Sequence, residues 1–299
     1  MKGLLVTAAF RAGWLFARLV PEQVAMGTFQ WGADVATRRG GPGVAQLRRN
    51  LARVVPRAGA AELDELVARA MRSYARYWCE TFRLRRGDVQ AVHEAVERTA
   101  TGQENLHAAY AEGNGVILAL PHSGSWDLAG VWLLGHTEQV SVVVQRVRPE
   151  SLYRSFTRAR QQLGFEVVPS AGGDSRPTEL LAQRLRAGGT VCLFADRDLT
   201  ANGVPVSFFN GTTKMPAGPA YLAASTGAAL LPVGTWFTET GWGLRVHPPV
   251  KVNGVEGIGA ATQALADVFA ADIAAHPEDW HMLQRLWLAE EPEPAENED

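Results

Sequence analysis

Short apolar runs alternate with helix-like stretches over the second half of the chain, and this alternation limits the possible folds more than any other feature. The apolar runs that we expect to form strands are 116–120, 140–144, 165–168, 190–195, 229–234 and 244–247. Helical stretches are expected at 127–134, 149–163, 177–187 and 216–225, followed by 259–275 and 278–288. Such alternation predicts an α/β fold with a central, mostly parallel or mixed sheet flanked by helices on both faces.

The first 113 residues show the spacing of helices instead. Within 60–86, the residues Leu63, Leu66, Ala70 and Tyr74 recur at steps of three and four, which is the helical period. A Gly-Gly-Pro-Gly breaker stands at 40–43. We predict one domain over 1–288, mainly helical to 113 and α/β from 114, followed by a disordered acidic tail at 289–299.

The composition excludes some classes of protein, and the distribution of charge favours others. With 46% hydrophobic and 20% charged residues, the chain is neither intrinsically disordered nor a multi-span membrane protein. Its net charge of −2 is the sum of an acidic C-terminal end and a basic first third. Residues 1–100 hold 16 Lys or Arg and 9 Asp or Glu. A basic surface predicts an anionic partner such as nucleic acid, lipid headgroups or a phosphorylated ligand. The alternative is an arginine-rich surface without a specific partner.

Two cysteines, Cys79 and Cys192, provide neither a disulfide framework nor the spacing of a metal site. This usage fits a reducing, cytoplasmic setting.

Residues 1–20 are nearly apolar but are interrupted by Arg11 and Arg18, which share one helical face. A membrane span needs about 20 apolar residues with few charges, and no small-residue cleavage site of a signal peptide follows. We expect either a helix packed on the core or an amphipathic helix in the membrane interface with Trp14 as an anchor.

Polar residues follow two of the predicted strands. His122 and Asp127 come after 116–120, and Asp196 and Arg197 come after 190–195. In open α/β sheets, ligands bind beyond the carboxyl ends of the strands. A carboxylate that accepts from Nδ1–H of a histidine leaves Nε2 free to take a proton, which is a general-base arrangement. Gly124 permits the tight loop that this arrangement needs.

The His-x4-Asp spacing also has a purely structural interpretation. Ser123 or Ser125 can cap the following helix, Asp127 can complement its dipole, and His122 can be an incidental loop residue. A metal centre at His122 is disfavoured, because no second ligand stands at a familiar offset.

Three further segments accompany the His-x4-Asp motif. They are Gln145-Arg-Val-Arg-Pro149, the long block from Leu193 to Ala228, and Pro277-Glu-Asp-Trp-His-Met-Leu-Gln284. Together with the motif they make residues 1–288 resemble the lysophospholipid and lipid A acyltransferase family. Within it, the sequence is most similar to the actinobacterial phosphatidylinositol mannoside acyltransferases.

The resemblance implies acyl transfer from acyl-CoA, a co-substrate, to a mannose hydroxyl of a phosphatidylinositol mannoside or related glycolipid. It implies no cofactor, no metal and no nucleic-acid partner, and it places the enzyme peripherally on an anionic membrane surface, at the cytoplasmic face of the cell membrane. His122 would be the general base, and Asp127 and Asp196 would be the catalytic carboxylates. Which of the two carboxylates contacts the imidazole is open, and the other would pair with an arginine such as Arg160 or Arg197.

Anionic substrates and a tetrahedral oxyanion need further partners. The cations that we expect to bind phosphates are Arg146, Arg148, Arg160, Arg197 and Lys214, with surface solvation as the alternative for each. Backbone N–H groups at the start of the helix after His122 can hold the oxyanion. Phe208 and Phe209 either line an acyl groove or pack in the core. His136, His247 and His281 receive no role.

Three other functions remain open. The first is an acyltransferase that uses a lysophospholipid or another glycolipid as acceptor. The second is a non-catalytic peripheral lipid-binding protein that keeps the same fold. The third is a His/Asp metallohydrolase, which would bind a metal and lose activity with chelators.

Overall fold

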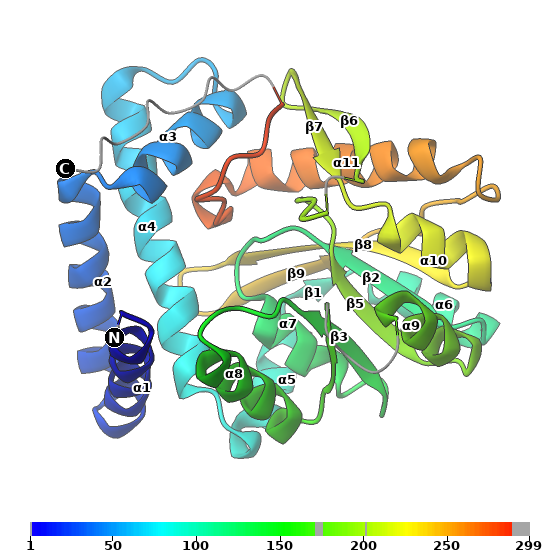
Figure 1. Ribbon diagram of the computed structural model, residues 1–299, viewed down its shortest axis with the longest axis horizontal. Helices are drawn as coiled ribbons and strands as arrows, with labels where there is room; N and C mark the ends of the chain where they lie inside the picture. Colours follow the sequence, from blue (N-terminus) through cyan, green and yellow to red (C-terminus); the bar gives the residue numbers. More distant parts are fainter. Residues whose placement is uncertain (1, 171–175, 201, 289–299) are drawn as a thin grey trace.

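A mixed, mostly parallel sheet forms the centre of the molecule (Figure 1). The computed structural model describes residues 2–170, 176–200 and 202–288, with side chains from residue 10 onward except that of Arg11. Within those residues, seven strands pair in the order β1-β9-β8-β2-β5-β3-β4. β8 and β9 run antiparallel, and the other neighbours run parallel. The predicted α/β fold is confirmed.

All six predicted strands are present, with ends that differ by at most three residues. The sheet consists of β1 (Ala100–Thr101), β2 (Val116–Leu120), β3 (Val140–Val144), β4 (Glu166–Pro169), β5 (Thr190–Phe194), β8 (Ala229–Phe237) and β9 (Trp242–Val246). The sequence did not predict β1, because two residues are too short to show a period.

An antiparallel hairpin of β6 (Val204–Phe208) and β7 (Gly211–Met215) was also not predicted. Its two-residue turn has positive φ at Phe209 (45°) and Asn210 (58°), as the turns that suit hairpin twist require. A phenylalanine at such a position is unusual, so the sequence did not indicate a turn here.

The first four helices are α1 (Lys2–Leu19), α2 (Glu22–Arg39), α3 (Pro42–Val54) and α4 (Ala60–Arg83). The predicted breaker lies between α2 and α3. Gly40 ends α2 in the left-handed region at φ 64°, and Pro42 occupies the first position of α3, where a missing N–H costs nothing. The long α4 contacts α1, α2 and α3 and stands beside one end of the sheet (Figure 1).

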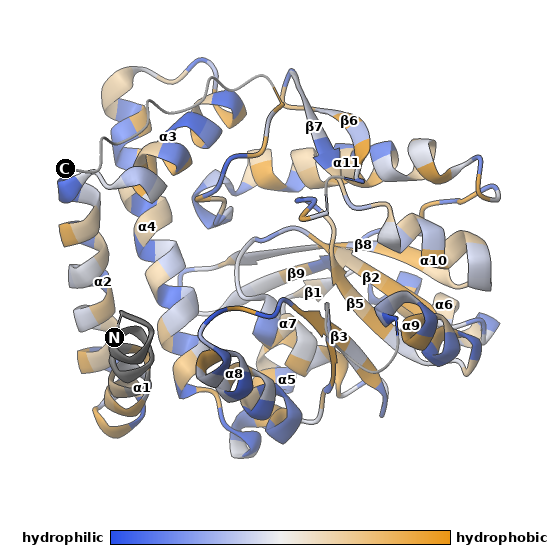
Figure 2. Cartoon of the chain, viewed as in Figure 1, coloured by the Kyte–Doolittle hydropathy of each residue, from blue (hydrophilic) through white to orange (hydrophobic). Residues whose placement is uncertain are grey.

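Helices cover both faces of the sheet. One core contains residues of α5 (Val89–Glu97), α6 (Gln103–Glu112) and α7 (Trp126–Leu133), and the other contains residues of α9 (Pro177–Arg186), α10 (Gly218–Thr226) and α11 (Ile258–Ala275). β2 supplies Leu118 to the first core and Ile117 and Ala119 to the second. β2 is accordingly apolar throughout (Figure 2), as expected for a strand buried on both faces. The remaining helix, α8 (Glu150–Leu163), connects β3 to β4.

Among the described residues, α11 is the one helix whose length and composition would allow it to cross a membrane. One of its faces is occupied by the protein core, because Ala261, Leu265, Phe269 and Ile273 are all buried there. This packing accounts for its apolar sequence.

The predicted helix at 278–288 is wrong. A single 3-10 turn (Pro277–Asp279) is followed by extended chain. Tertiary partners take the place of helical hydrogen bonds: His281 N–H donates to the carbonyl of His122 at 2.8 Å, and Asn50 Nδ2 donates to the carbonyls of Met282 and Gln284 at 2.6 and 3.0 Å. The predicted tail at 289–299 lies outside the described residues.

The described part of α1 packs on the protein. Ala17 is fully buried, and Trp14 stacks on Phe82 of α4 with ring centroids 5.3 Å apart. Arg18 donates to the carbonyls of Phe82 and Leu84 at 2.8 and 3.2 Å. Arg18 therefore caps the end of α4 and does not point toward a membrane surface.

Candidate active site

His122 and Asp196 meet at the carboxyl ends of two adjacent strands. β2 and β5 pair in parallel with Leu120 opposite Phe194, so the residues two positions beyond each strand end come together. Asp196 Oδ1 lies 2.7 Å from His122 Nδ1, and Asp196 Oδ2 accepts the backbone N–H of His122 at 2.9 Å. The two are thus joined through both the ring and the backbone.

Asp196 is wholly buried, whereas the side chain of His122 is 32% exposed. Burial alone would raise the pKa of Asp196. The charge of His122, the two hydrogen bonds from His122 and the indole N–H of Trp280 outweigh burial and lower that pKa. An ionised carboxylate can only accept, so the imidazole proton lies on Nδ1 and the lone pair lies on Nε2.

Asp127 has a different partner. Arg160 Nη2 lies 2.8 Å from Asp127 Oδ1 and 2.9 Å from Oδ2, and Tyr77 donates to Oδ2 at 2.8 Å. Of the two predicted carboxylates, Asp196 therefore contacts the imidazole and Asp127 pairs with Arg160. Burial and the nearby charge of Asp127 raise the pKa of Tyr77 well above its usual value, which keeps this phenol a hydrogen-bond donor.

The loop that carries His122 is fixed from two sides. Thr235 of β8 donates to the carbonyl of Ser123 at 2.6 Å, and Gly124 N–H donates to the carbonyl of Asp279 at 2.9 Å. Gly124 has φ 54°, and a Cβ at this position would lie 2.7 Å from the backbone of Thr235. As expected from the sequence, glycine is what allows this tight loop.

His281 belongs to the site, although no role was predicted for it. It is buried, its ring contacts those of Tyr77 and Trp126, and it lines the same cavity as His122. Ser73 donates to Asp279 at 2.6 Å and accepts from His281 Nε2 at 2.9 Å. No sequence pattern could connect His281 to Ser73, which precedes it by 208 positions.

Burial shifts the pKa values of both His281 and Asp279. Burial, and then the charge of His122, lower the pKa of His281 to about 3, so its ring is neutral. Burial also raises the pKa of Asp279 to about 6. Within the described part of the chain, Nδ1 of His281 is buried without a hydrogen-bond partner, which leaves one acceptor available near the site.

A cavity of about 770 Å³ adjoins His122. Residues of α7 and of the sheet form much of its wall, and apolar members of the lining are Leu118, Leu120, Trp132, Leu133, Val142, Phe165, Val233 and Leu244. The cavity therefore reaches between α7 and the sheet. Pockets of this size and polarity bind apolar ligands next to a few polar groups, so the arrangement can hold a hydrocarbon chain beside an imidazole base.

The predicted phosphate-binding residues differ in their surroundings. Arg197 is half-buried, lines the cavity and has no hydrogen-bonded partner among the described residues. Burial lowers the pKa of Arg197, and the charge of Asp196 opposes this shift. Arg160 is occupied by Asp127, and Arg146 is exposed and pairs with Glu150 at 3.0 Å.

Two other predicted cations and the phenylalanine pair do not line the cavity. Arg148 is exposed, and Lys214 is half-buried on β7. Phe208 is 2% exposed and packs against Trp280 and Trp287, so the core interpretation holds for it.

Known proteins are similar to this chain over nearly its whole length. The family described as bacterial lipid A biosynthesis acyltransferase matches residues 4–289. The phosphatidylinositol mannoside acyltransferase of Mycolicibacterium smegmatis (strain ATCC 700084 / mc(2)155) is 49% identical over 288 residues, covering 96% of this chain and 93% of the relative. The phosphatidylinositol mannoside acyltransferases of two Mycobacterium tuberculosis strains, CDC 1551 / Oshkosh and ATCC 25618 / H37Rv, are each 49% identical over 282 residues, covering 94% of this chain and 88% of the relative. The chain therefore belongs to the bacterial lipid A biosynthesis acyltransferase family and is an acyltransferase.

Proposed function

We propose that this acyltransferase moves a long-chain acyl group from acyl-CoA to a mannose hydroxyl of a phosphatidylinositol mannoside. The observation that carries the proposal is the His122–Asp196 pair beside an apolar cavity. The names of the relatives at 49% identity supply the acceptor.

The proposed reaction uses His122 as general base. Nε2 takes the proton of the mannose hydroxyl while the hydroxyl oxygen attacks the thioester carbonyl carbon. The tetrahedral intermediate then collapses, the C–S bond breaks, and the imidazolium gives its proton to the departing CoA thiolate. Buried Asp196 stabilises the imidazolium through Nδ1, and base catalysis of this kind contributes about 10²–10⁴-fold.

The surroundings of His122 suit the other parts of the substrates. The cavity would hold the acyl chain, and Arg197 would meet a phosphate because its charge lies at the cavity wall. The oxyanion would bind near the start of α7, where the first N–H groups of a helix lack intrahelical partners. The hydroxyls of Ser123 and Ser125 are buried there without a partner among the described residues.

An acyl-transfer assay with purified protein tests the proposal. A panel of acyl-CoA lengths is combined with phosphatidylinositol mannoside, lysophospholipid and another glycolipid as acceptors. We expect transfer to the mannoside and its loss in His122→Ala, with His247→Ala as the matched control because His247 also pairs with an aspartate, at 2.8 Å. Preference for a lysophospholipid would replace the proposed acceptor. Lipid binding without acyl-CoA consumption would identify a binding protein instead.

We also propose that the enzyme works peripherally at the cytoplasmic face of the cell membrane. Support comes from large apolar side chains that are exposed on α1 and α2, among them Leu15 (59%), Leu19 (73%) and Trp31 (66%). The basic excess of residues 1–100 adds attraction to anionic lipids. Apolar side chains next to basic residues are what interfacial helices use to bind such membranes.

A further inference from the structure

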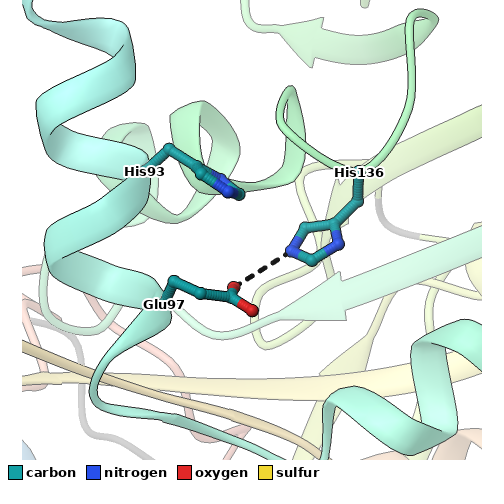
Figure 3. A group of neighbouring side chains, drawn as sticks. All are labelled: His93, Glu97 and His136. Carbon is teal, nitrogen blue, oxygen red and sulfur yellow. Dashed lines mark hydrogen bonds and ion pairs between the residues drawn. The ribbon is translucent and has the colours of Figure 1, made fainter.

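A second cluster of ionisable side chains lies away from His122. His93 and Glu97 stand four residues apart on α5, which places them on one helical face. His136 follows α7 in the chain, and Figure 3 shows the three side chains converging. One ligand atom from each lies within 4.8 Å of those of the other two.

His93 is oriented as metal-binding histidines usually are. His93 Nδ1 lies 2.8 Å from the carbonyl oxygen of Trp132. A carbonyl can only accept, so Nδ1 carries the proton and the lone pair of Nε2 is free. A backbone carbonyl that fixes the tautomer in this way is the common outer partner of a metal-binding histidine.

Glu97 completes the set with a negative charge. Its Oε2 accepts from the indole N–H of Trp132 and lies 3.2 Å from His136 Nε2. Burial would raise the pKa of Glu97, but the bond from Trp132 and the charges of His136 and His93 lower it. Burial lowers the pKa of His136.

The close approach of the two elements depends on Gly135. A Cβ at this position would lie 2.2 Å from the ring of His93, so a larger residue would push α5 away from the turn after α7. His107 of α6 adds a fourth imidazole, with its ring centroid 5.5 Å from that of His136. Its side chain is exposed and can move toward a shared ion.

We propose that His93, Glu97 and His136 bind a divalent cation of the zinc class. Two imidazoles and one carboxylate suit Zn²⁺ and similar first-row metals, whereas Ca²⁺ and Mg²⁺ prefer oxygen ligands alone. Ligands at about 2.0–2.2 Å from a tetrahedral Zn²⁺ are roughly 3.4 Å apart, so small side-chain rotations close the cluster. The metal takes the place of the proton between His136 and Glu97, and His107 or water fills the fourth position.

The proposed metal would stabilise the position of α7, which forms part of the cavity wall. Trp132 lines that cavity and holds both His93, through its carbonyl, and Glu97, through its indole. The metal would link the end of α7 to α5, while the other end of α7 follows the His122 loop. We therefore expect a stabilising metal that takes no part in the proton transfer at His122.

Calorimetric titration with ZnCl₂ tests the site on the full chain, without an affinity tag and washed with chelator, at about pH 7.5. We expect one Zn²⁺ per chain, a higher melting temperature with Zn²⁺, and visible absorption of Co²⁺ bound at the same site. Glu97→Gln, which keeps an acceptor for Trp132, and His93→Gln should each weaken binding by about tenfold or more. His247→Gln is the matched control and should leave binding unchanged.

Two results would overturn the proposal. One is wild-type protein that binds no Zn²⁺ at a several-fold excess. The other is equal affinity in wild-type protein and in the correctly folded Glu97→Gln variant, as judged by circular dichroism, which would place the ion on other side chains.

Discussion

Arg160 holds Asp127 in an ion pair in which one nitrogen, Nη2, lies 2.8 Å from Oδ1 and 2.9 Å from Oδ2. Asp196 meanwhile accepts two hydrogen bonds from His122. The two carboxylates near the imidazole therefore have different tasks. Asp196 orients the proposed base, and Asp127 ties the first turn of α7 to α8 and, through Tyr77, to α4.

Replacing Asp196 by asparagine should lower kcat by about 10²–10⁴-fold with a small change in KM. Asparagine cannot offer a negative charge to the imidazolium, so the transition state loses its stabilisation while the substrates still bind. Steady-state kinetics measures this. Asp272→Asn, at the aspartate paired with His247, should keep wild-type kcat, and equal losses in both variants would refute the assignment.

Replacing Asp127 by asparagine should lower the free energy of unfolding by about 3–5 kcal/mol, because it leaves a buried arginine charge unpaired. Arg160→Met in the same chain should restore part of the loss, because neither charge then remains buried. Chemical denaturation of the two single variants and the double variant measures this coupling. Additive losses would show that the ion pair carries no coupling energy.

Filling the cavity at Cys192 should change the preferred acyl chain. Cys192 lines the cavity and lies opposite Leu118. It stands four residues before Asp196, or about 13 Å along the strand. Cys192→Phe should therefore block long chains and shift the preference toward shorter acyl-CoA. Competition between acyl-CoA lengths measures it, with Cys192→Ala as a control that keeps the cavity open, and an unchanged preference would place the acyl chain elsewhere.

The pH dependence of stability should report on His281. Its pKa is about 3 in the folded protein and about 6.5 in an unfolded chain. The unfolded state thus binds more protons at this side chain between these values, so His281 contributes a loss of stability as the pH drops from about 6.5 toward 3. Asp279, whose pKa is raised to about 6, contributes in the opposite direction at lower pH, so the effect of His281 is read from the difference between variants. The expected contribution is on the order of 3 kcal/mol by about pH 4.

His281→Gln should gain stability relative to wild-type protein as the pH falls below about 6.5, because glutamine does not titrate but can still donate to Ser73. Denaturation between about pH 4 and 7 measures the slope. His107→Gln, at an exposed histidine, should keep the wild-type slope. A stability difference between His281→Gln and wild-type protein that does not change with pH would assign the pH dependence to other groups.

Charges on the exposed apolar face of α1 should weaken membrane binding. Leu15→Glu with Leu19→Glu alters side chains that are 59% and 73% exposed, so the packing of α1 on α4 is kept. We expect less co-sedimentation with anionic vesicles and unchanged melting. Val255→Glu is the control, since Val255 is also an exposed apolar residue (63%), and equal binding of all variants would argue against this face.

Local patterns in the sequence were sufficient for the α/β class and for six strands of the central sheet. The strands β2 and β3 were predicted with their observed ends, because a short apolar run between turn residues allows few alternatives. The same patterns failed at 278–288. A helix was predicted there, but the segment instead forms hydrogen bonds with His122, Thr212 and Asn50. These partners come from distant parts of the chain, so no local pattern could reveal them.

The sequence by itself determined the α/β class, the position of His122 at a strand end and the choice of glycine at 124. The parallel pairing of β2 with β5 decided that Asp196, and not the nearer Asp127, contacts the imidazole. Tertiary packing alone brought His281 to Ser73 and His136 to His93 and Glu97. The physical reason is that hydrogen bonds and ligand sets depend on distances in space, which sequence spacing predicts only within one helix, strand or turn.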